Sequence, residues 1–407
     1  MSLRILHRVL VIAPALLLAA CATLDARIPV PNAELASRAT PIDFAGVRAW
    51  GDEVPSDIAA ALRTRLPSVK RLAHSDGRKN TSRAEVEILA LSGGGSDGAF
   101  GAGLLVGWTK RGDRPQFEVV TGVSAGALTA PFAFLGPRYD SKLREIWTRY
   151  GTNQLVTAQL LPALFGGPSL TDSGPLRQLI ANYIDRRVLS EIAAEYRKGR
   201  LLLILTTNLD AQRPVIWNMG EIAVSGHPNA LELFRSVLLA SASIPGALPP
   251  VRIPVTADGK TYDELHVDGG TTREVFVAPI DVPLTALDRF YDALPKRRLY
   301  IVKNGKYHAE YEPVREQAFP IAARAIETLV KTQHRNDIYR IYRMAKDSGA
   351  EFNLAFVPQE FQAKPKELFD PKYQAALFDE GFELARARRA WVKVPPDIDP
   401  KSGAQRK

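Results

Sequence analysis

The chain of 407 residues has a single cysteine, Cys21, so it cannot form an internal disulfide bond. No apolar run reaches the roughly 20 residues that a membrane-spanning helix needs. The sequence also contains no low-complexity tract and no repeat with a period of about 20 to 50 residues, which excludes repeat architectures. With 46% apolar residues, the chain can form one large α/β domain or two ordinary ones.

The N-terminus has the layout of an export signal. Basic side chains precede an apolar run over residues 9–20, which stops at Cys21. The tetrapeptide that ends there, Leu-Ala-Ala-Cys, resembles the lipobox of bacterial lipoproteins, in which the signal is cut before the cysteine and the thiol is lipidated. We therefore expect residues 1–21 to be a lipoprotein signal peptide ending at a lipidated Cys21. An ordinary signal peptide that happens to contain a cysteine is the alternative.

Residues 22–84 are expected to form a tether and an N-terminal extension. Residues 22–40 contain Ala, Pro and Arg without apolar periodicity, which is typical of a flexible linker. Ala22, rather than an aspartate, follows the cysteine, and the resemblance to lipoproteins then favours the outer membrane. The expected location is the bacterial cell envelope, with the protein anchored to the outer membrane and facing the periplasm.

The net charge of +9 comes from 53 basic and 44 acidic residues. A basic surface commonly associates with anionic partners. Export excludes nucleic acid, so anionic lipid headgroups fit the expected location better. Because the charge is spread along the chain, an ordinary solvated surface explains it equally well.

From residue 85 onward, short apolar segments alternate with longer periodic ones. This alternation is typical of a mostly parallel sheet with helices on both faces, and it predicts a three-layer α/β/α domain over residues 85–394. Within it, residues 140–199 are interpreted as a cap or insertion, and residues 395–407 as a disordered tail. Strands are predicted over residues 86–91, 117–121, 201–206, 265–267, 299–303 and 352–357, and helices over residues 99–110, before Pro137, and over 230–242 and 320–349. The last helix has apolar spacing at Ile321, Ile326, Leu329 and Val330 and is expected to pack on the sheet.

The strongest chemical signal is Gly122-Val123-Ser124-Ala125-Gly126, a G-x-S-x-G motif between a predicted strand and a predicted helix. A serine on such a turn is forced outward, beside the positive end of the helix dipole, which stabilises developing negative charge. Gly122 and Gly126 let the backbone turn without a Cβ clash. Ser124 is therefore the candidate nucleophile, although the pentapeptide alone also occurs in ordinary turns.

A second glycine-rich turn, Gly93-Gly94-Gly95, ends the first predicted strand and opens a helix. Its bare N–H groups suit an anion, which in a serine hydrolase is the tetrahedral oxyanion. The same segment through Gly98 also matches G-x-G-x-x-G, the dinucleotide fingerprint, with Glu118 twenty residues on. Glu118 falls near the start of its strand rather than the end, and exported proteins lack ready access to NAD. The oxyanion interpretation is therefore preferred.

The third element is Asp268-Gly269-Gly270, at the end of a short predicted strand. By itself Asp-Gly-Gly is a turn. Because the carboxyl ends of parallel strands converge on one crevice, however, we expect Asp268 to lie near Ser124.

Together these blocks resemble the patatin-like phospholipase family. The glycine triplet matches its oxyanion block, the G-x-S-x-G its nucleophile block and Asp-Gly-Gly its aspartate block. Residues 240–250, with their prolines, resemble the segment that the family places before its aspartate. The resemblance spans residues 85–275. Asp97 departs from it, since many members carry a basic residue there, so the help of an arginine at the oxyanion loop is absent.

The resemblance implies a Ser124–Asp268 dyad, an acyl-enzyme at Ser124, and neither a metal nor a cofactor. Burial must raise the pKa of the aspartate, or its hydrogen bond must be short and dry, for it to act as a base. A histidine triad is the alternative. An α/β-hydrolase orders its triad serine, acid, histidine, so His266 stands on the wrong side of Asp268. The other histidines that follow Ser124 are His227, His308 and His334.

The resulting hypothesis is a serine esterase that hydrolyses an acyl ester in a membrane lipid, most simply a phospholipid or lysophospholipid. A catalytically silent envelope lipoprotein that binds lipid or a partner protein on the same scaffold is the alternative. Apolar residues between 155 and 180 could line an acyl pocket, but they are interpreted as ordinary core.

Overall fold

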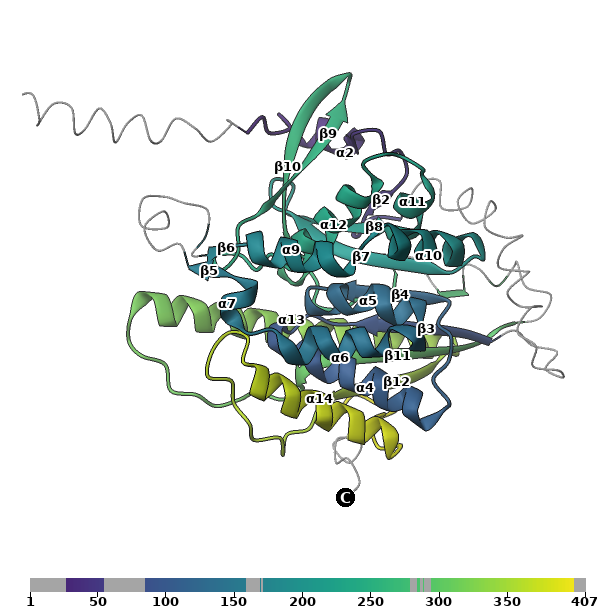
Figure 1. Cartoon of the computed structure of the whole chain (residues 1–407), viewed down its shortest axis with the longest axis vertical. Helices are drawn as coiled ribbons and strands as arrows, with labels where there is room; N and C mark the ends of the chain where they lie inside the picture. Colours follow the sequence, from purple (N-terminus) through teal and green to yellow (C-terminus); the bar gives the residue numbers. More distant parts are fainter. Residues whose placement is uncertain are drawn as a thin grey trace, which may run out of the picture.

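The computed structural model describes residues 27–54, 85–158, 169, 171–278, 284–285, 288 and 294–398. The predicted signal peptide with Cys21, residues 55–84 of the extension and the tail from residue 399 lie outside the described residues. A sheet runs through the middle of the molecule, and helices lie on both sides of it (Figure 1).

Ten strands from the described residues form this sheet. Its centre is parallel, in the order β7-β4-β3-β11-β12, whereas β8, β10, β9, β1 and β2 pair antiparallel on the β7 side. The predicted fold class is confirmed, although β8 and β9 were not predicted. The strands are β1 Thr40–Pro41, β2 Arg48–Trp50, β3 Glu85–Leu91, β4 Val119–Val123, β7 Leu201–Asn208, β8 Arg213–Asn218, β9 Val251–Ala257, β10 Lys260–Asp268, β11 Lys296–Lys306 and β12 Glu351–Val357.

The two faces of the sheet have separate cores, because successive strand residues point to opposite sides. Leu89 and Leu91 of β3 join the larger core with residues of α4, α5, α6 and α12, whereas Ile88 and Ala90 join a smaller core with Ile338 of α13. Helices therefore cover both faces. They are α4 Gly98–Arg111, α5 Ala125–Leu135, α6 Asp140–Arg149, α7 Thr152–Leu155, α9 Gly174–Tyr183, α10 Arg186–Arg197, α11 Met219–Val224, α12 Ala230–Ser241, α13 Ala318–Asp347 and α14 Pro371–Arg386.

Helix α14 was not predicted, and it packs closely on α4. A Cβ atom on Gly103 would lie 1.9 Å from the carbonyl oxygen of Phe378. The glycine therefore permits the two backbones to approach, and both helices contribute to the larger core.

Helix α13 packs differently from the prediction. Its second half contributes Ile338, Ile341 and Ala345 to the smaller core. Ile321, Ile326 and Leu329, which were expected to face the sheet, are 52%, 55% and 69% exposed. The apolar spacing was therefore real, but it does not face the sheet in the first half of the helix.

The N-terminal extension joins the main domain. Helix α2, Ala33–Arg38, begins at the cap Asn32, β1 pairs with β9 and β2 pairs with β8. The tether prediction is therefore wrong for residues 27–40. The tail prediction is wrong for residues 395–398, since Asp397 accepts a hydrogen bond of 2.9 Å from the hydroxyl of Tyr307.

The segment between residues 140 and 199 divides into two parts. Helix α6 packs with α4 and α14, and α10 packs with α5 and α11, as ordinary parts of the helical layers. Helix α7 and helix α9 contact each other and lie on the left of the view in Figure 1. Two short strands, β5 Thr157–Ala158 and β6 Thr171–Asp172, pair with each other near them.

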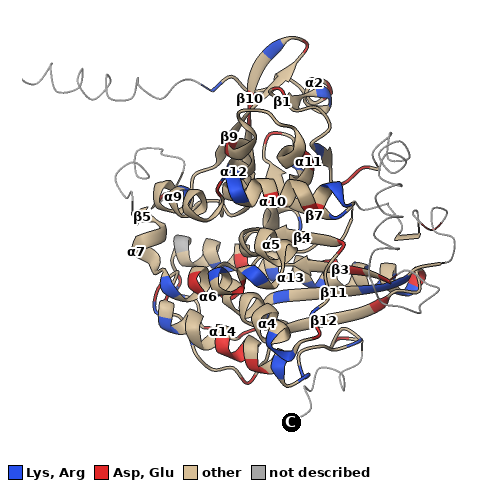
Figure 2. Ribbon diagram, turned by 45° about the vertical axis from the view of Figure 1, so that its right-hand side comes forward, with Lys and Arg blue, Asp and Glu red and all other residues tan. Residues whose placement is uncertain are grey.

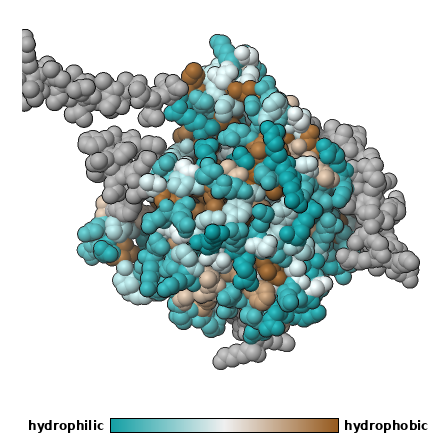
Figure 3. Space-filling model, viewed as in Figure 1, coloured by the Kyte–Doolittle hydropathy of each residue, from teal (hydrophilic) through white to brown (hydrophobic). Residues whose placement is uncertain are grey.

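Basic and acidic residues are interspersed along the ribbon (Figure 2), and the face seen in Figure 3 mixes hydrophilic and hydrophobic residues. None of the helices among the described residues has the length and hydropathy to cross a membrane.

Candidate active site

Ser124 stands on a sharp turn between β4 and α5. Its φ of 52° lies in the left-handed region that non-glycine residues rarely adopt. The flanking glycines are required by close packing, since a Cβ on Gly126 would lie 2.3 Å from the carbonyl oxygen of Leu91, and one on Gly122 2.6 Å from that of Gly126. The predicted strand-turn-helix context of Ser124 is confirmed. Strain of this kind at a serine is typical of functional turns.

Asp268 reaches Ser124 by a route that the sequence did not predict. Val123, the last residue of β4, pairs with Leu205 of β7, and Asp268, the last residue of β10, pairs with the next residue, Thr206. Strand β4 is parallel to β7 and β10 is antiparallel to it, and the two strands flank β7. Their last residues pair with neighbouring residues of β7, so the carboxyl ends of β4 and β10 lie close together. The expectation that Asp268 ends a parallel strand was wrong, but the expected proximity holds.

Two serines at the end of α12 tie these strand ends together. The hydroxyl of Ser241 accepts a hydrogen bond of 3.0 Å from the Ser124 N–H and donates one of 2.7 Å to the carbonyl oxygen of Leu205. The carbonyl oxygen of Ser243 accepts from the Asp268 N–H at 2.9 Å. The sequence pointed to residues 240–250 only through family resemblance and gave no role to either serine.

The Asp268 carboxyl is buried, with two hydrogen-bond donors. Burial raises its pKa to about 7, against the opposing effect of hydrogen bonds from the Ser124 side chain and the Gly270 N–H. The Gly270 bond, to Oδ1, is 2.8 Å long. Gly269 and Gly270 begin the short 3₁₀ turn Gly269–Thr271 that follows the strand. A carboxyl with a pKa near 7 can take a proton from a hydroxyl group at neutral pH.

The glycine triplet lies beside Ser124, but its three amides are not equivalent. The Gly93 N–H donates to the carbonyl oxygen of Glu274 at 3.1 Å, so the prediction that it serves the oxyanion is wrong. Gly95 lines a pocket together with Ser124. Gly94 precedes it and packs against the backbone of Asn304. Gly94 and Gly95 therefore remain the candidate oxyanion donors.

Asp97 points away from the anion site. Its Oδ1 accepts a hydrogen bond of 2.7 Å from the hydroxyl of Tyr373, and burial raises the pKa of the carboxyl, although Tyr373 and Lys303 act against the shift. A cation from β11, Lys303, thus stands near the residue where the family commonly has a basic side chain.

The position of Glu118 argues against the dinucleotide-binding alternative. Glu118 directly precedes β4, at the opposite end of the strand from Ser124. Its carboxylate accepts a hydrogen bond of 2.5 Å from the Glu87 N–H. Glu118 therefore links the starts of two strands.

The central part of the chain is similar to a known protein family. A family model described as patatin-like phospholipase matches residues 89–281, from β3 to beyond the aspartate loop. This part of the chain belongs to the patatin-like phospholipase family. The family consists of lipid acyl hydrolases, as the sequence motifs indicated.

Solved structures that resemble the chain include VipD from Legionella pneumophila and human GIVD cytosolic phospholipase A2. The first shares 12% identity, with 78% of this chain and 72% of VipD covered and a TM-score of 0.35. The second also shares 12% identity, with 89% of this chain and 66% of the human protein covered and a TM-score of 0.36. Among curated proteins, no sequence matches this chain.

An apolar pocket opens beside Ser124 in the patatin-like domain. It is lined by Gly95, Ser124 and mostly apolar side chains, among them Leu155, Leu176 and Leu179. The interpretation of these residues as core is confirmed for Leu155 and Leu176, with Leu179 packed against that core, and all three also line the pocket. An adjoining apolar pocket shares Leu128, Ile146, Leu176 and Leu179 with the first and extends to Ile180, Tyr183 and Leu238.

None of the described histidines that follow Ser124 is a hydrogen-bond partner of Asp268, as a triad would require. Both ring nitrogens of His266 are occupied, by Thr206 Oγ1 at 2.9 Å and by Glu264 at 3.0 Å. His227 packs on Phe44, His308 packs on Tyr307, and His334 is buried in α13. The groups that hydrogen-bond Asp268 are Ser124 and Gly270.

Proposed function

We propose that this protein hydrolyses a carboxylic ester of a lipid, with Ser124 as the nucleophile and Asp268 as the general base. The observation that carries the proposal is the meeting of β4 and β10 at adjacent residues of β7, which puts the Ser124 hydroxyl in hydrogen-bond contact with a buried carboxyl. A pKa near neutrality suits that carboxyl to proton transfer at physiological pH.

In the proposed reaction, Asp268 takes the Ser124 proton while Oγ attacks the ester carbonyl. The N–H groups of Gly94 and Gly95 and the positive end of α5 stabilise the oxyanion. The alcohol leaves with the proton from Asp268, and an acyl-enzyme remains at Ser124. Asp268 then activates a water molecule, whose attack releases the fatty acid and restores the serine.

The substrate class follows from the walls of the pocket. An apolar cavity that begins at Ser124 suits the acyl chain of the ester, because an apolar wall gains free energy from removing the chain from water. The headgroup side of the ester then faces outward. A lipid of the envelope, phospholipid or lysophospholipid, is the substrate that we propose.

The proposed location is the periplasmic side of the outer membrane, with the chain held there through a lipidated Cys21. Such an anchor would keep the active site close to its lipid substrate. Mass spectrometry of the protein from envelope fractions tests this: a diacylglyceryl adduct on Cys21, absent in Cys21→Ser, is expected. An unmodified thiol in the wild type argues for another mode of attachment.

The function is tested by ester hydrolysis with purified full-length protein in detergent, with a metal chelator present. Ser124→Ala and Asp268→Asn are both expected to lose activity, by about 10² to 10⁴-fold for the base. Ser37→Ala and Asp258→Asn, which change exposed residues of the same types, are the matched controls and should behave as wild type. Loss in Ser124→Ala alone would point to another base. Inactive wild type with retained lipid binding would favour the silent lipoprotein.

A further inference from the structure

A third carboxyl lies between the two catalytic loops. Glu274 follows the Asp-Gly-Gly turn and is only 7% exposed. A Cβ on Gly93 would lie 2.6 Å from its Oε1, and a Cβ on Gly270 would lie 2.4 Å from its Oε2. The carboxyl is therefore wedged between the glycine loop and the aspartate loop, where only glycines leave it room.

The same position brings Glu274 close to Asp268. The Cβ site of Gly270 is 2.4 Å from Glu274 Oε2 and 3.1 Å from Asp268 Oδ1, so these two oxygens are at most 5.5 Å apart, the sum of the two distances. Two buried carboxyls at this separation resist ionising together, because each charge disfavours the other. They share their protons as a pair.

The groups that face Glu274 come from three elements. Burial and the charges of Asp268 on β10 and Asp337 on α13 raise the pKa of Glu274, and Lys303 on β11 opposes them. Asp337 accepts a hydrogen bond of 2.9 Å from the Glu274 N–H and is held by Arg340. The charged or titratable groups around Lys303 are Asp97, Glu310, Lys331 and His334.

We propose that Glu274 is a positioning residue that must carry a proton for the enzyme to work. The inference rests on the proposed function. In the working state Asp268 is ionised and Glu274 is a neutral acid beside the glycine loop. When Glu274 loses its proton to solvent, its negative charge lies next to both Asp268 and the oxyanion, so the tetrahedral intermediate is no longer stabilised.

The pH dependence of kcat/KM tests this proposal. The wild type should fall by about tenfold per pH unit above the point where Glu274 ionises, near pH 8. Glu274→Gln cannot ionise, so activity is expected to be lower but to show no alkaline fall. The matched control is Glu118→Gln, since Glu118 is half-buried with its pKa raised to about 7 but lies at the far end of β4. Its profile should match the wild type.

The variant Lys303→Met tests the direction in which the alkaline fall of kcat/KM moves. Removing this cation takes away the group that lowers the pKa of Glu274, so the alkaline fall should move to higher pH. If the fall instead comes from deprotonation of Lys303, it will disappear in Lys303→Met and shift to lower pH in Glu274→Gln. Either of those results, or an unchanged fall in Glu274→Gln, overturns the proposal.

Infrared spectroscopy of the Ser124→Ala protein separates this inference from the function. Protonated buried carboxyls have their own C=O stretches, and Asp268 and Glu118, with pKa values raised to about 7, also contribute at pH 7. The Glu274 band is therefore the difference between Ser124→Ala and the Ser124→Ala, Glu274→Gln double variant, and it should be present at pH 7 and vanish above the pH of the alkaline fall. A wild type without esterase activity would defeat the proposed function, while the infrared band would still decide whether Glu274 holds the proton. Absence of the band at pH 7 overturns the inference.

Discussion

Glu264 and Asp268 lie four residues apart on strand β10, and both are buried, yet their pKa values are shifted from the ordinary values in opposite directions. The pKa of Glu264 is about 2, and that of Asp268 is about 7. Burial raises both. For Glu264, hydrogen bonds and charge from Arg48 and His266 outweigh burial, whereas Asp268 has only a hydroxyl and one amide. The candidate active site is therefore the place on this strand where, among the described residues, a buried carboxyl has only neutral hydrogen-bond donors.

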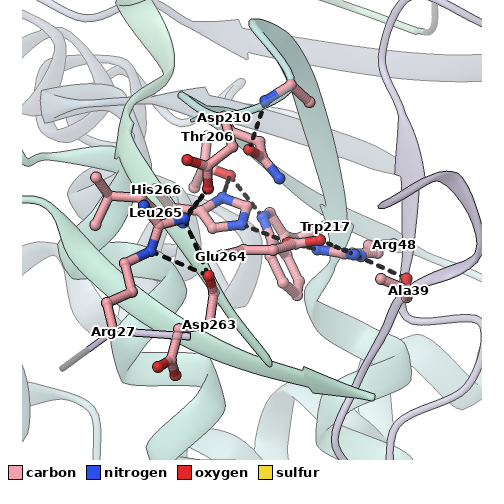
Figure 4. Close-up of polar contacts among 12 residues, drawn as sticks. Arg27, Ala39, Arg48, Thr206, Asp210, Trp217, Asp263, Glu264, Leu265 and His266 are labelled. Carbon is pink, nitrogen blue, oxygen red and sulfur yellow. Dashed lines mark hydrogen bonds and ion pairs between the residues drawn. The ribbon is translucent and has the colours of Figure 1, made fainter. Parts of the chain in front are cut away.

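The side chain of Glu264 belongs to a continuous series of hydrogen bonds (Figure 4). Arg48 donates to Glu264, which also accepts from His266 Nε2, because a carboxylate can only accept. His266 Nδ1 then accepts from Thr206, whose oxygen accepts from Trp217 Nε1 at 2.8 Å. None of these five residues has a buried side-chain nitrogen or oxygen that lacks a hydrogen-bond partner. This series of hydrogen bonds also fixes the N-terminal extension, since Arg48 bonds the carbonyl oxygen of Ala39 at 2.8 Å.

A large gain of stability is expected for Asp268→Asn. The folded pKa of about 7 lies above the ordinary value of 3.8, so the ionised carboxyl destabilises the fold above neutral pH, by up to about 4 kcal/mol. Removing it should raise the free energy of unfolding at pH 8 by about 1 to 4 kcal/mol and change little at pH 3. Urea titrations at both pH values measure this. A variant that is less stable at pH 8 would contradict the comparison.

Glu264→Gln should do the reverse. It leaves the nearly buried Arg48 guanidinium without its counter-charge, which costs about 3 to 5 kcal/mol. The folded pKa of about 2 lies below the ordinary 4.5, so the contribution is present above pH 4.5 and is lost as the pH falls towards 2. Wild type and variant should differ most at pH 7 and converge in acid. An equal difference at both pH values would indicate a packing defect instead.

Thr206→Val breaks the series of hydrogen bonds in its middle without changing a charge. The Trp217 N–H and the His266 Nδ1 lose their common partner, and unsatisfied buried groups cost about 1 to 3 kcal/mol. Thr148→Val on the exposed part of α6 is the control. Differential scanning calorimetry should show a lower melting temperature only for Thr206→Val, with no dependence on pH between 6 and 8.

The smallest effect is expected for Glu145→Gln. Glu145 pairs with Arg149 one turn on, at 2.7 Å, but both side chains are exposed to solvent. Such pairs contribute less than about 1 kcal/mol and are screened by salt. Stability of this variant should match the wild type at 0.5 M salt. A loss comparable to that of Glu264→Gln would mean that burial is not what separates the two classes of acid.

Local sequence patterns were sufficient for many elements. The predicted strands at β3, β7 and β12 and the predicted helices at α4 and α12 were correct to within a few residues, because apolar periodicity and turn residues lie within each segment. Helix α14 was missed, and the first half of α13 was misjudged, since periodicity does not state what a face packs against. The orientation of β10 was also missed, because strand direction depends on pairing with β7.

The sequence by itself determined Ser124, its elbow and the Asp268 turn, since each motif is contiguous and its backbone geometry is local. Only the tertiary structure decided what surrounds them. Ser241 bonds Ser124 across 117 residues, and Lys303 and Glu274 come from segments that no motif marks. The pKa values that make one acid of β10 a base and the other an ion-pair partner depend on burial and on cations from distant segments. Burial and the distances between charged groups exist only in the folded chain, so the sequence alone does not determine these pKa values.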